Sequence, residues 1–311
     1  MKLTRLKRLS YDEIQWDGYD LILLASGFED RSCFTLASIP ESAIGKCVVL
    51  GFVNDRNILS RPKNDELFAN KRLVPSVFAD PQAYENLITE SLCSLSHSVG
   101  DRPLRVFIDY SVMTRSWYGF LLTWLKYSVQ FAMSDVDFIY AHGRYESEFE
   151  PLHIDEIMAI PGFEGGCAGA RRTIAFFGLG YDRYATLAVN ELIEPDHVTC
   201  YIAREGTSDI NSQRVLDQNK EILALSDTPA IYLPLGNIQD SFRILYEHFT
   251  QVPNEDEVIA IPMGPKPHVL ATLMVAQNVQ RVTCLHARGS RIKPVQVLAS
   301  GVVSAWRGEY R

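Results

Sequence analysis

Two stretches of the chain place polar residues directly after an apolar strand pattern and directly before a helical one. The first covers residues 104–131, where the apolar run 104–108 ends in an acid, two hydroxyl side chains and a cation. These polar residues are Asp109, Ser111, Thr114 and Arg115. A turn between a strand and a helix presents free backbone N–H groups and the positive end of the helix dipole to an anion. The stretch therefore predicts a site for a ligand that carries phosphate, or else an ordinary strand–helix turn whose cation is solvated.

The second stretch, residues 258–278, repeats this pattern. An apolar strand runs into a turn that carries Gly264, Lys266 and His268, and a helical run follows. Lys266 falls at the point that is equivalent to Arg115. The repetition favours anion binding, because the same arrangement occurs at two separate places in the chain.

Other predicted strand ends are matched at an offset of about 150 residues, and a period this long indicates a duplicated domain rather than an array of short repeats. The turns after the strands at residues 19–25 and 173–177 both have glycine, an aromatic residue, an acid and then arginine. The strands at residues 136–141 and 281–285 both end in histidine and arginine. The matched residues are Ser26, Gly27 and Arg31 with Gly180 and Arg183, and His142 and Arg144 with His286 and Arg288.

The cations at these strand ends form the strongest candidate binding set. They are Arg31, Arg115, Arg144, Arg183, Lys266 and Arg288. Arginine offers a bidentate fork to phosphate, and a cluster of cations would make a basic site in an acidic protein. The alternative is a set of separate surface charges, each paired with a carboxylate such as Glu29, Asp30 or Asp182.

Asp109, His142 and His268 are the candidates for catalysis. A histidine at such a turn could be the general base for attack on a phosphodiester, although a lone histidine near a strand end is more often structural. Asp109 ends a strand in the region where ligands of Rossmann-like folds bind. The second stretch has no acid at the equivalent point, so any chemistry would be asymmetric.

Cofactor motifs are incomplete. Gly178 and Gly180 supply two glycines of the G-x-G-x-x-G fingerprint, but Arg183 stands at the third position and would obstruct the close packing that glycine permits. The chain has no Walker A motif, and no pair of histidines shows ligand spacing on one element. We therefore expect no cofactor and no metal.

Strands that alternate with helices predict an α/β fold with a mostly parallel sheet in each half. We expect two tandem Rossmann-like units related by internal duplication and pseudo-twofold symmetry. The first would be residues 1–165, including an N-terminal arm, and the second residues 166–311. Ligands of such sheets bind beyond the carboxyl ends of the strands. If the halves pack as a symmetric pair, the matched turns would face one shared basic cleft.

Composition narrows the class of protein further. The 311 residues are 47% hydrophobic and 22% charged, which is ordinary for a globular protein. The formal net charge of −8 argues against a broad nucleic-acid-binding surface, because such binding rests on neutralising phosphates. The six cysteines include no C-x-x-C pair and indicate reduced thiols in a cytoplasmic protein. No apolar run has the length of a membrane span or a secretory signal.

The motif Asp109-x-Ser111-x-x-Thr114-Arg115 resembles the D-x-T-G-G-T-K signature of CARF domains, and the run from Gly264 to Pro267 resembles its G-T-K-P part. CARF domains, and SAVED domains built from two CARF-like units, are Rossmann-like sensors of cyclic oligonucleotides in bacterial defence. The resemblance implies that the ligand pocket is lined by Ser111, Thr114, Arg115, Gly264 and Lys266, with the turns at residues 26–31 and 178–183 on its other side. The first motif departs from the family pattern at Val112 and Met113, which replace two glycines, and the second lacks the acid.

Three functions follow as alternatives. The chain is a sensor of a nucleotide or cyclic oligonucleotide in antiphage defence that signals to an effector or another defence protein. Alternatively, it is an enzyme that acts on a nucleotide or phosphodiester in the same cleft, as a ring nuclease, a nucleotide hydrolase or a glycosyl-transfer enzyme. The third alternative is a scaffold subunit with a degenerate pocket. Cations in both halves and the lack of a recognisable catalytic pair favour the sensor. The ligand, the partner and the formation of homo-oligomers stay open.

Overall fold

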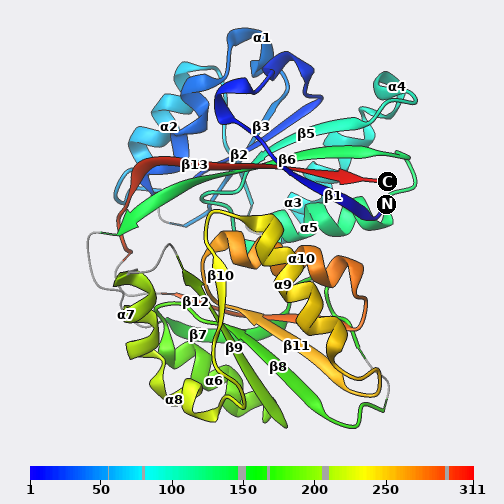
Figure 1. Ribbon diagram of the computed structural model, residues 1–311. Helices are drawn as coiled ribbons and strands as arrows, with labels where there is room; N and C mark the ends of the chain where they lie inside the picture. The colour runs from blue at the N-terminus through cyan, green and yellow to red at the C-terminus, as the bar shows by residue number, and fades with distance from the viewer. Residues whose placement is uncertain (55, 79–80, 146–151, 167–168, 205–209, 291–293) are drawn as a thin grey trace. The chain divides into compact units, whose positions relative to one another are not determined.

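The chain folds into two units, and each unit contains its own sheet of strands that alternate with helices along the chain (Figure 1). The computed structural model describes residues 1–54, 56–78, 81–145, 152–166, 169–204, 210–290 and 294–311. The first unit contains residues 1–148 and 295–311, and the second contains residues 149–294. Both units are α/β structures with mostly parallel sheets, which confirms the predicted fold class.

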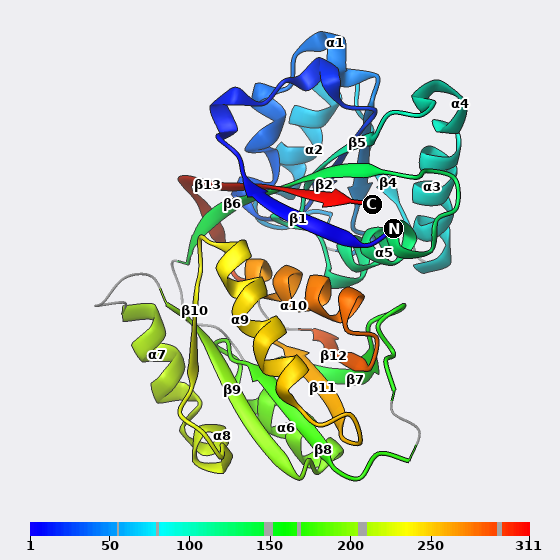
Figure 2. The same ribbon diagram turned by 45° about the vertical axis from the view of Figure 1, so that its right-hand side comes forward.

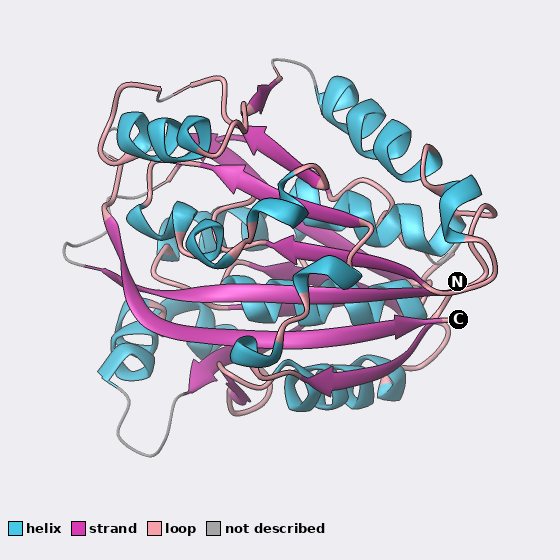
Figure 3. Cartoon of the chain, turned by 90° about the horizontal axis from the view of Figure 1, so that it is seen from above, coloured by secondary structure: helices cyan, strands magenta, loops and turns pink. Residues whose placement is uncertain are grey.

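The first sheet has seven strands in the order β1-β13-β6-β5-β2-β3-β4. The strands from β2 to β6 are parallel, whereas β13 is antiparallel to both β6 and β1. Their bounds are β1 Leu3–Arg8, β2 Leu21–Ser26, β3 Cys47–Gly51, β4 Ser76–Val77, β5 Leu104–Asp109, β6 Ser134–Tyr145 and β13 Val297–Tyr310. The predicted N-terminal arm is therefore an edge strand. The backbone N–H groups of Lys2 and Arg311 each donate to the other's carbonyl, so the termini lie side by side (Figure 3).

The helices of the first unit follow the parallel strands. They are α1 Glu41–Ile44, α2 Arg61–Asn70, α3 Pro81–Cys93, α4 Ser96–Val99 and α5 Arg115–Tyr127, and short 3-10 turns occur at Tyr11–Glu13, Trp16–Gly18, Asp30–Cys33 and Thr35–Ser38. Helix α5 buries Tyr118, Leu121, Leu122 and Leu125. Their spacing of three and four residues gives α5 one apolar face, which fixes its position on the sheet.

The second sheet has six strands in the order β10-β9-β8-β11-β12-β7, and only β7 is antiparallel to its neighbour. Their bounds are β7 His153–Ala159, β8 Thr173–Gly178, β9 His197–Arg204, β10 Ile231–Pro234, β11 Glu257–Pro262 and β12 Val282–Ser290. The helices are α6 Arg183–Ile193, α7 Ile210–Gln218, α8 Lys220–Leu225, α9 Ile238–Gln251 and α10 Lys266–Asn278. Figure 2 shows α9 and α10 on one face of this sheet and α6 and α8 on the other.

The antiparallel strand of each unit follows the last parallel strand of the other unit in the chain. β7 comes after β6 but pairs with β12, and β13 comes after β12 but pairs with β6. The units therefore differ from the predicted domains, residues 1–165 and 166–311, at both ends. The physical reason is that long-range packing decides the pairing of each strand, so neither composition nor periodicity reveals which sheet it joins.

With β7 and β13 taken as equivalents, and apart from the additional edge strand β1 of the first sheet, the two sheets share one strand order. The orders are β4-β3-β2-β5-β6-β13 and β10-β9-β8-β11-β12-β7. Helices α5 and α10 follow the equivalent strands β5 and β11, and each has 13 residues. The chain therefore contains two versions of one topology, as the matched turns predict.

Several general properties follow from the part of the chain that the structure describes. No helix in it is both long and apolar enough to cross a membrane. Its free cysteines are Cys33, Cys47, Cys93, Cys200 and Cys284, and Cys167 lies outside the described residues. Within the same residues, no three His, Cys, Asp or Glu side chains group in a way that could hold a metal ion.

Candidate ligand-binding site

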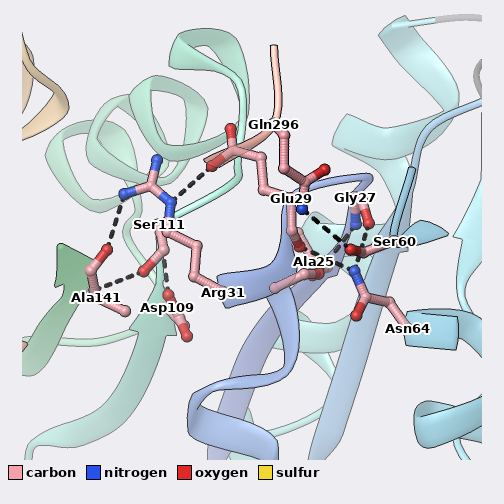
Figure 4. A network of polar contacts seen from close by, with 11 residues as sticks. Ala25, Gly27, Glu29, Arg31, Ser60, Asn64, Asp109, Ser111, Ala141 and Gln296 are labelled. Carbon is pink, nitrogen blue, oxygen red and sulfur yellow. Dashed lines mark hydrogen bonds and ion pairs between the residues drawn. The ribbon is translucent and has the colours of Figure 1, made fainter. Parts of the chain in front are cut away.

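The turn after β2 is held by side chains of its own unit. The backbone N–H of Gly27 donates to the Ser32 hydroxyl at 3.0 Å. Asn64 of α2 donates to the carbonyl oxygens of Gly27 and Glu29 at 2.8 and 2.9 Å (Figure 4). Ser26 is buried, and its hydroxyl donates to a carboxylate of α2. The predicted ligand residues Ser26 and Gly27 are therefore fixed by contacts within the protein.

Arg31 is buried and links this turn to the end of β6. Its Nε donates to Oε2 of Glu29 at 2.6 Å, and its Nη1 donates to the carbonyl of Ala141 at 2.8 Å (Figure 4). Its guanidinium carbon lies 5.0 Å from the centroid of the Tyr140 ring, within range of a cation–π contact. Only 2% of Arg31 is exposed. Arg31 is therefore paired with Glu29, the carboxylate partner named in the alternative prediction.

Asp109 and Ser111 join the end of β5 to β6. The buried carboxylate of Asp109 accepts from the Thr35 hydroxyl and, at 3.0 Å, from the backbone N–H of Ser111. The Ser111 hydroxyl in turn accepts from the backbone N–H of Ala141 at 2.8 Å (Figure 4). Burial raises the pKa of Asp109, while these hydrogen bonds and the charge of Arg31 oppose the rise. Both residues therefore stabilise the strand ends from which a ligand site would be built.

Thr114 and Arg115 lie at the start of α5, as the first stretch predicts. Thr114 is the N-cap, and its Oγ1 accepts from the backbone N–H of Trp117 at 3.3 Å. Arg115 is the first helical residue and is half-buried. A capped helix with a cation in its first turn is an arrangement that can bind an anion.

His142 faces a hydroxyl from the neighbouring strand. Its Nε2 lies 2.7 Å from Oγ of Ser304 on β13, where residues 300–302 form a bulge in the ladder. Burial, and after it the charge of Arg31, lower the pKa of His142 to about 4. The imidazole is therefore neutral at pH 7 and can act as a base. Arg144, two residues further along β6, is exposed.

In the second unit, glycines allow two turns to pack against each other. A β-carbon at Gly180 would lie 2.5 Å from the carbonyl oxygen of Met263, and one at Gly264 would lie 2.9 Å from that of Leu179. The turns after β8 and β11 are thus in backbone contact. Both predicted glycines are required by this close approach.

Lys266 is the first residue of α10 and is half-buried, so its position matches that of Arg115. His268, in the same helical turn, is buried, and its Nε2 lies 3.3 Å from the carbonyl oxygen of Pro234. Burial lowers the pKa of His268 to about 4, and the hydrogen bond opposes this shift. A neutral imidazole that donates to Pro234 links α10 to the end of β10.

Two of the predicted cations form exposed ion pairs. Arg183 begins α6, and its Nη1 lies 3.3 Å from Oε1 of Glu221 while its Nη2 donates to the Tyr184 hydroxyl at 2.8 Å. Nη1 of Arg288 lies 4.0 Å from a carboxylate oxygen of Glu156. These two residues fit the alternative of separate surface charges.

Some of the predicted site residues form one group in each unit, whereas Arg144, Arg183 and Arg288 lie outside these groups. In the first unit, Arg31, Asp109, Ser111 and His142 meet around the end of β6, with Ser26 and Gly27 on the adjoining turn and Thr114 and Arg115 at the start of α5. In the second unit, Gly180, Gly264 and Lys266 lie where the turns after β8 and β11 meet. The shared cleft involves both units and stays a prediction.

The asparagines that hold the turns were missed in the sequence. Asn219 donates to the carbonyl of Gly180 at 2.9 Å, as Asn64 does to that of Gly27. No local motif marks either residue, because each acts from a helical segment that is distant in sequence. Their separation is close to the offset of the matched turns, and this is the signal that could have identified them.

An open cavity of about 1120 Å³ lies elsewhere in the first unit. It is lined by the segment from Arg8 to Asp12, by part of β13 and by Asp30, Cys33 and Phe34. The lining does not include Arg31, Ser111 or Arg115. The cavity therefore does not coincide with the predicted binding residues.

Comparison with known proteins does not assign the chain to a family. No protein-family model and no curated protein matches it. Among solved structures, it is similar to a universal stress protein from Pseudomonas aeruginosa UCBPP-PA14, with 9% identity, coverage of 88% of this chain and 95% of the other, and a TM-score of 0.26. A universal stress protein from Archaeoglobus fulgidus DSM 4304 gives 9% identity, 88% and 99% coverage, and a TM-score of 0.25. A ketoreductase domain from the bacillaene assembly line gives 10% identity, coverage of 89% of this chain and 70% of the other, and a TM-score of 0.23. Similarity at this level carries no argument about function.

Proposed function

We propose that the chain binds a phosphate-bearing nucleotide, with cyclic oligonucleotides as the expected class, and that phosphate groups bind at the starts of α5 and α10. One observation carries this proposal. In two sheets of the same strand order, β5 and β11 each lead through a turn into a 13-residue helix whose first residue is a cation, Arg115 or Lys266.

The physical basis is the positive end of each helix, where Thr114 caps α5 and Pro267 leaves α10 with one N–H group fewer. The first turn of an α-helix has N–H groups without an intrahelical partner, and the helix dipole adds positive potential at that point. A phosphate accepts those hydrogen bonds, and a cation at the first helical residue adds a charge-assisted contact. A chain with a net charge of −8 would thus have two local sites of positive potential.

The resemblance of both turns to CARF motifs supports a biological role. In this proposal the chain is a CARF-like or SAVED-like sensor that works in the cytoplasm of a bacterium during antiphage defence. Ligand binding in the two units would be signalled to an effector or another defence protein. The duplicated topology supports this role, because it supplies two equivalent turns to one ligand or to two.

Calorimetric titration with cyclic triadenylate and with ATP tests the proposal. Arg115→Ala and Lys266→Ala should each weaken binding, because a charged hydrogen bond contributes roughly 1.5–3 kcal/mol, or on the order of ten- to a hundredfold in affinity. Lys220→Ala is the matched control, since Lys220 also begins a helix but is exposed. Equal affinities in all three variants would show that the turns are ordinary connections.

A hydrolase that acts on a phosphodiester is the second candidate, and the pair of His142 and Ser304 favours it. A neutral imidazole 2.7 Å from a hydroxyl has the geometry of a base beside a nucleophile. In that case His142→Ala and Ser304→Ala should both abolish turnover of cyclic triadenylate. Chromatography of the products measures this turnover. Turnover that survives both substitutions, or no turnover by the wild-type protein, would leave the binding module as the better account.

A further inference from the structure

Two tyrosines beside the start of α5 are buried with unpaired hydroxyls. Tyr110 lies between the end of β5 and the turn, and Tyr118 lies in the first turn of α5. Each is 0% exposed, and neither hydroxyl has a hydrogen-bond partner among the residues that the structure describes. The two rings are in edge-to-face contact with centroids 5.6 Å apart, so the two side chains form one cluster.

Three other buried tyrosines have partners for their hydroxyls, whereas the buried hydroxyl of Tyr310 has none among the described residues. Tyr19 donates to Asp137, Tyr84 donates to the carbonyl of Ser116 at 2.7 Å, and the Tyr201 hydroxyl lies 2.9 Å from that of Thr272. A buried polar group without a partner costs free energy, and phenylalanine would fill the same space without that cost. Two such hydroxyls at one helix start therefore point to a partner that the protein does not itself supply.

Two cations, Arg31 and Arg115, lie near the cluster, and the carboxylate of Asp109 also acts on Tyr110. Tyr110 stacks on Tyr140 with centroids 5.4 Å apart, and the Arg31 guanidinium lies over the Tyr140 ring. The charge of Arg115 acts on Tyr118, where burial raises the pKa and Arg115 opposes the rise. Burial likewise raises the pKa of Tyr110. Both phenols are therefore protonated at neutral pH and can donate to an acceptor.

We propose that Tyr110 and Tyr118 are ligand-binding residues whose hydroxyls donate to the phosphate oxygens of a ligand bound at the start of α5. This inference rests on the proposed function and specifies its first-unit site. The fourth residue of α10, equivalent to Tyr118 in α5, is Val269. The two sites are therefore unequal, and the one in the first unit has the additional hydrogen-bond donors.

The test removes only the hydroxyls, in the full-length protein. Tyr118→Phe and Tyr110→Phe should keep the wild-type midpoint of urea unfolding, or raise it, because they delete unpaired buried groups. Each should bind inorganic phosphate and cyclic triadenylate about tenfold more weakly, as expected for a lost hydrogen bond to a charged group. Tyr19→Phe is the matched control. It should lower the unfolding midpoint and leave binding unchanged, because Tyr19 lies at the amino ends of the parallel strands, whereas α5 follows the carboxyl end of β5.

The outcomes separate this inference from the proposed function. If Tyr118→Phe and Tyr110→Phe bind both probes as tightly as the wild-type protein while Arg115→Ala binds weakly, the hydroxyls are not ligand donors and the function still holds. If the Phe variants are instead destabilised like Tyr19→Phe, the hydroxyls have partners in the protein and the inference is wrong. If the wild-type protein binds neither probe, both proposals are wrong. Weaker phosphate binding alone supports the site for free phosphate rather than for the nucleotide.

Discussion

Replacing Arg307 by methionine tests how the C-terminal strand is joined to the first unit. Arg307 lies on β13, and its guanidinium donates two hydrogen bonds of 2.7 Å to Asp137 on β6. Asp137 is 1% exposed and also accepts from the Tyr19 hydroxyl. Removing one partner of a buried ion pair costs roughly 3–5 kcal/mol, because the remaining charge is left uncompensated. Since Arg307 is 23% exposed and water can partly replace it, we expect a loss of about 3 kcal/mol in the free energy of unfolding.

Urea unfolding of the full chain measures this loss. Arg5→Met is the matched control, because Arg5 is 66% exposed and lies 4.0 Å from Glu309, and a surface pair of this kind contributes at most about 1 kcal/mol. Adding Asp137→Asn to Arg307→Met should recover part of the stability, since it removes the uncompensated carboxylate. The reasoning is refuted if Arg307→Met costs no more than Arg5→Met.

Three further predictions concern acid stability, turn packing and the strand exchange. Burial lowers the pKa of His268 from 6.5 to about 4, so the neutral imidazole favours the folded state. Its contribution to the free energy of unfolding is fully present above pH 6.5, and up to roughly 3 kcal/mol of it is lost as the pH falls to 4. His268→Gln keeps a donor for Pro234 without titrating, so urea unfolding between pH 7 and pH 4 should show a smaller acid loss; an unchanged loss would assign it to other groups. Gly180→Ala should lower the midpoint of thermal unfolding and cost about 1–3 kcal/mol, because its β-carbon would lie 2.5 Å from a backbone oxygen. Gly45→Ala is the control, since nothing lies within 4 Å of a β-carbon at that position. Equal midpoints for the two variants would show that the turn at Gly180 has room for a methyl group. Removal of residues 295–311 should abolish hydrogen-exchange protection in the first sheet and leave it in the second, because β13 lies between β1 and β6; retained protection in β5 and β6 would contradict the assigned role of β13.

The strand–turn–helix pattern was readable from the sequence because it is local. The apolar run before Asp109 and the helix after Thr114 follow from residues that are adjacent in the chain, and the same holds around Gly264 and Lys266. Local pattern also matched Arg115 with Lys266, and the structure confirms that both begin equivalent helices.

Contacts between distant residues could not be read in the same way. Arg31 donates to the carbonyl of Ala141, which is 110 residues away in the sequence, and the hydrogen-bond partner of His142 is Ser304, which is 162 residues away. Both depend on which strands are neighbours. The strand β13 was missed because residues 297–310 contain glycine and serine and show only weak alternation of apolar and polar residues. Its pairing with β6 is decided by long-range packing rather than by its own pattern.

The exchange of β7 and β13 determines the order in which the units can be completed during synthesis. All six strands of the second sheet lie within residues 149–294, so this sheet can be complete before residues 297–310 emerge from the ribosome. Throughout that time β6 lacks the neighbour that will cover its free edge, and β1 has no strand to pair with. An uncovered strand edge is a template for pairing with another chain. Nascent chains that stop before residue 297 should therefore associate through β6. The first unit, whose synthesis begins first, would be the last to fold.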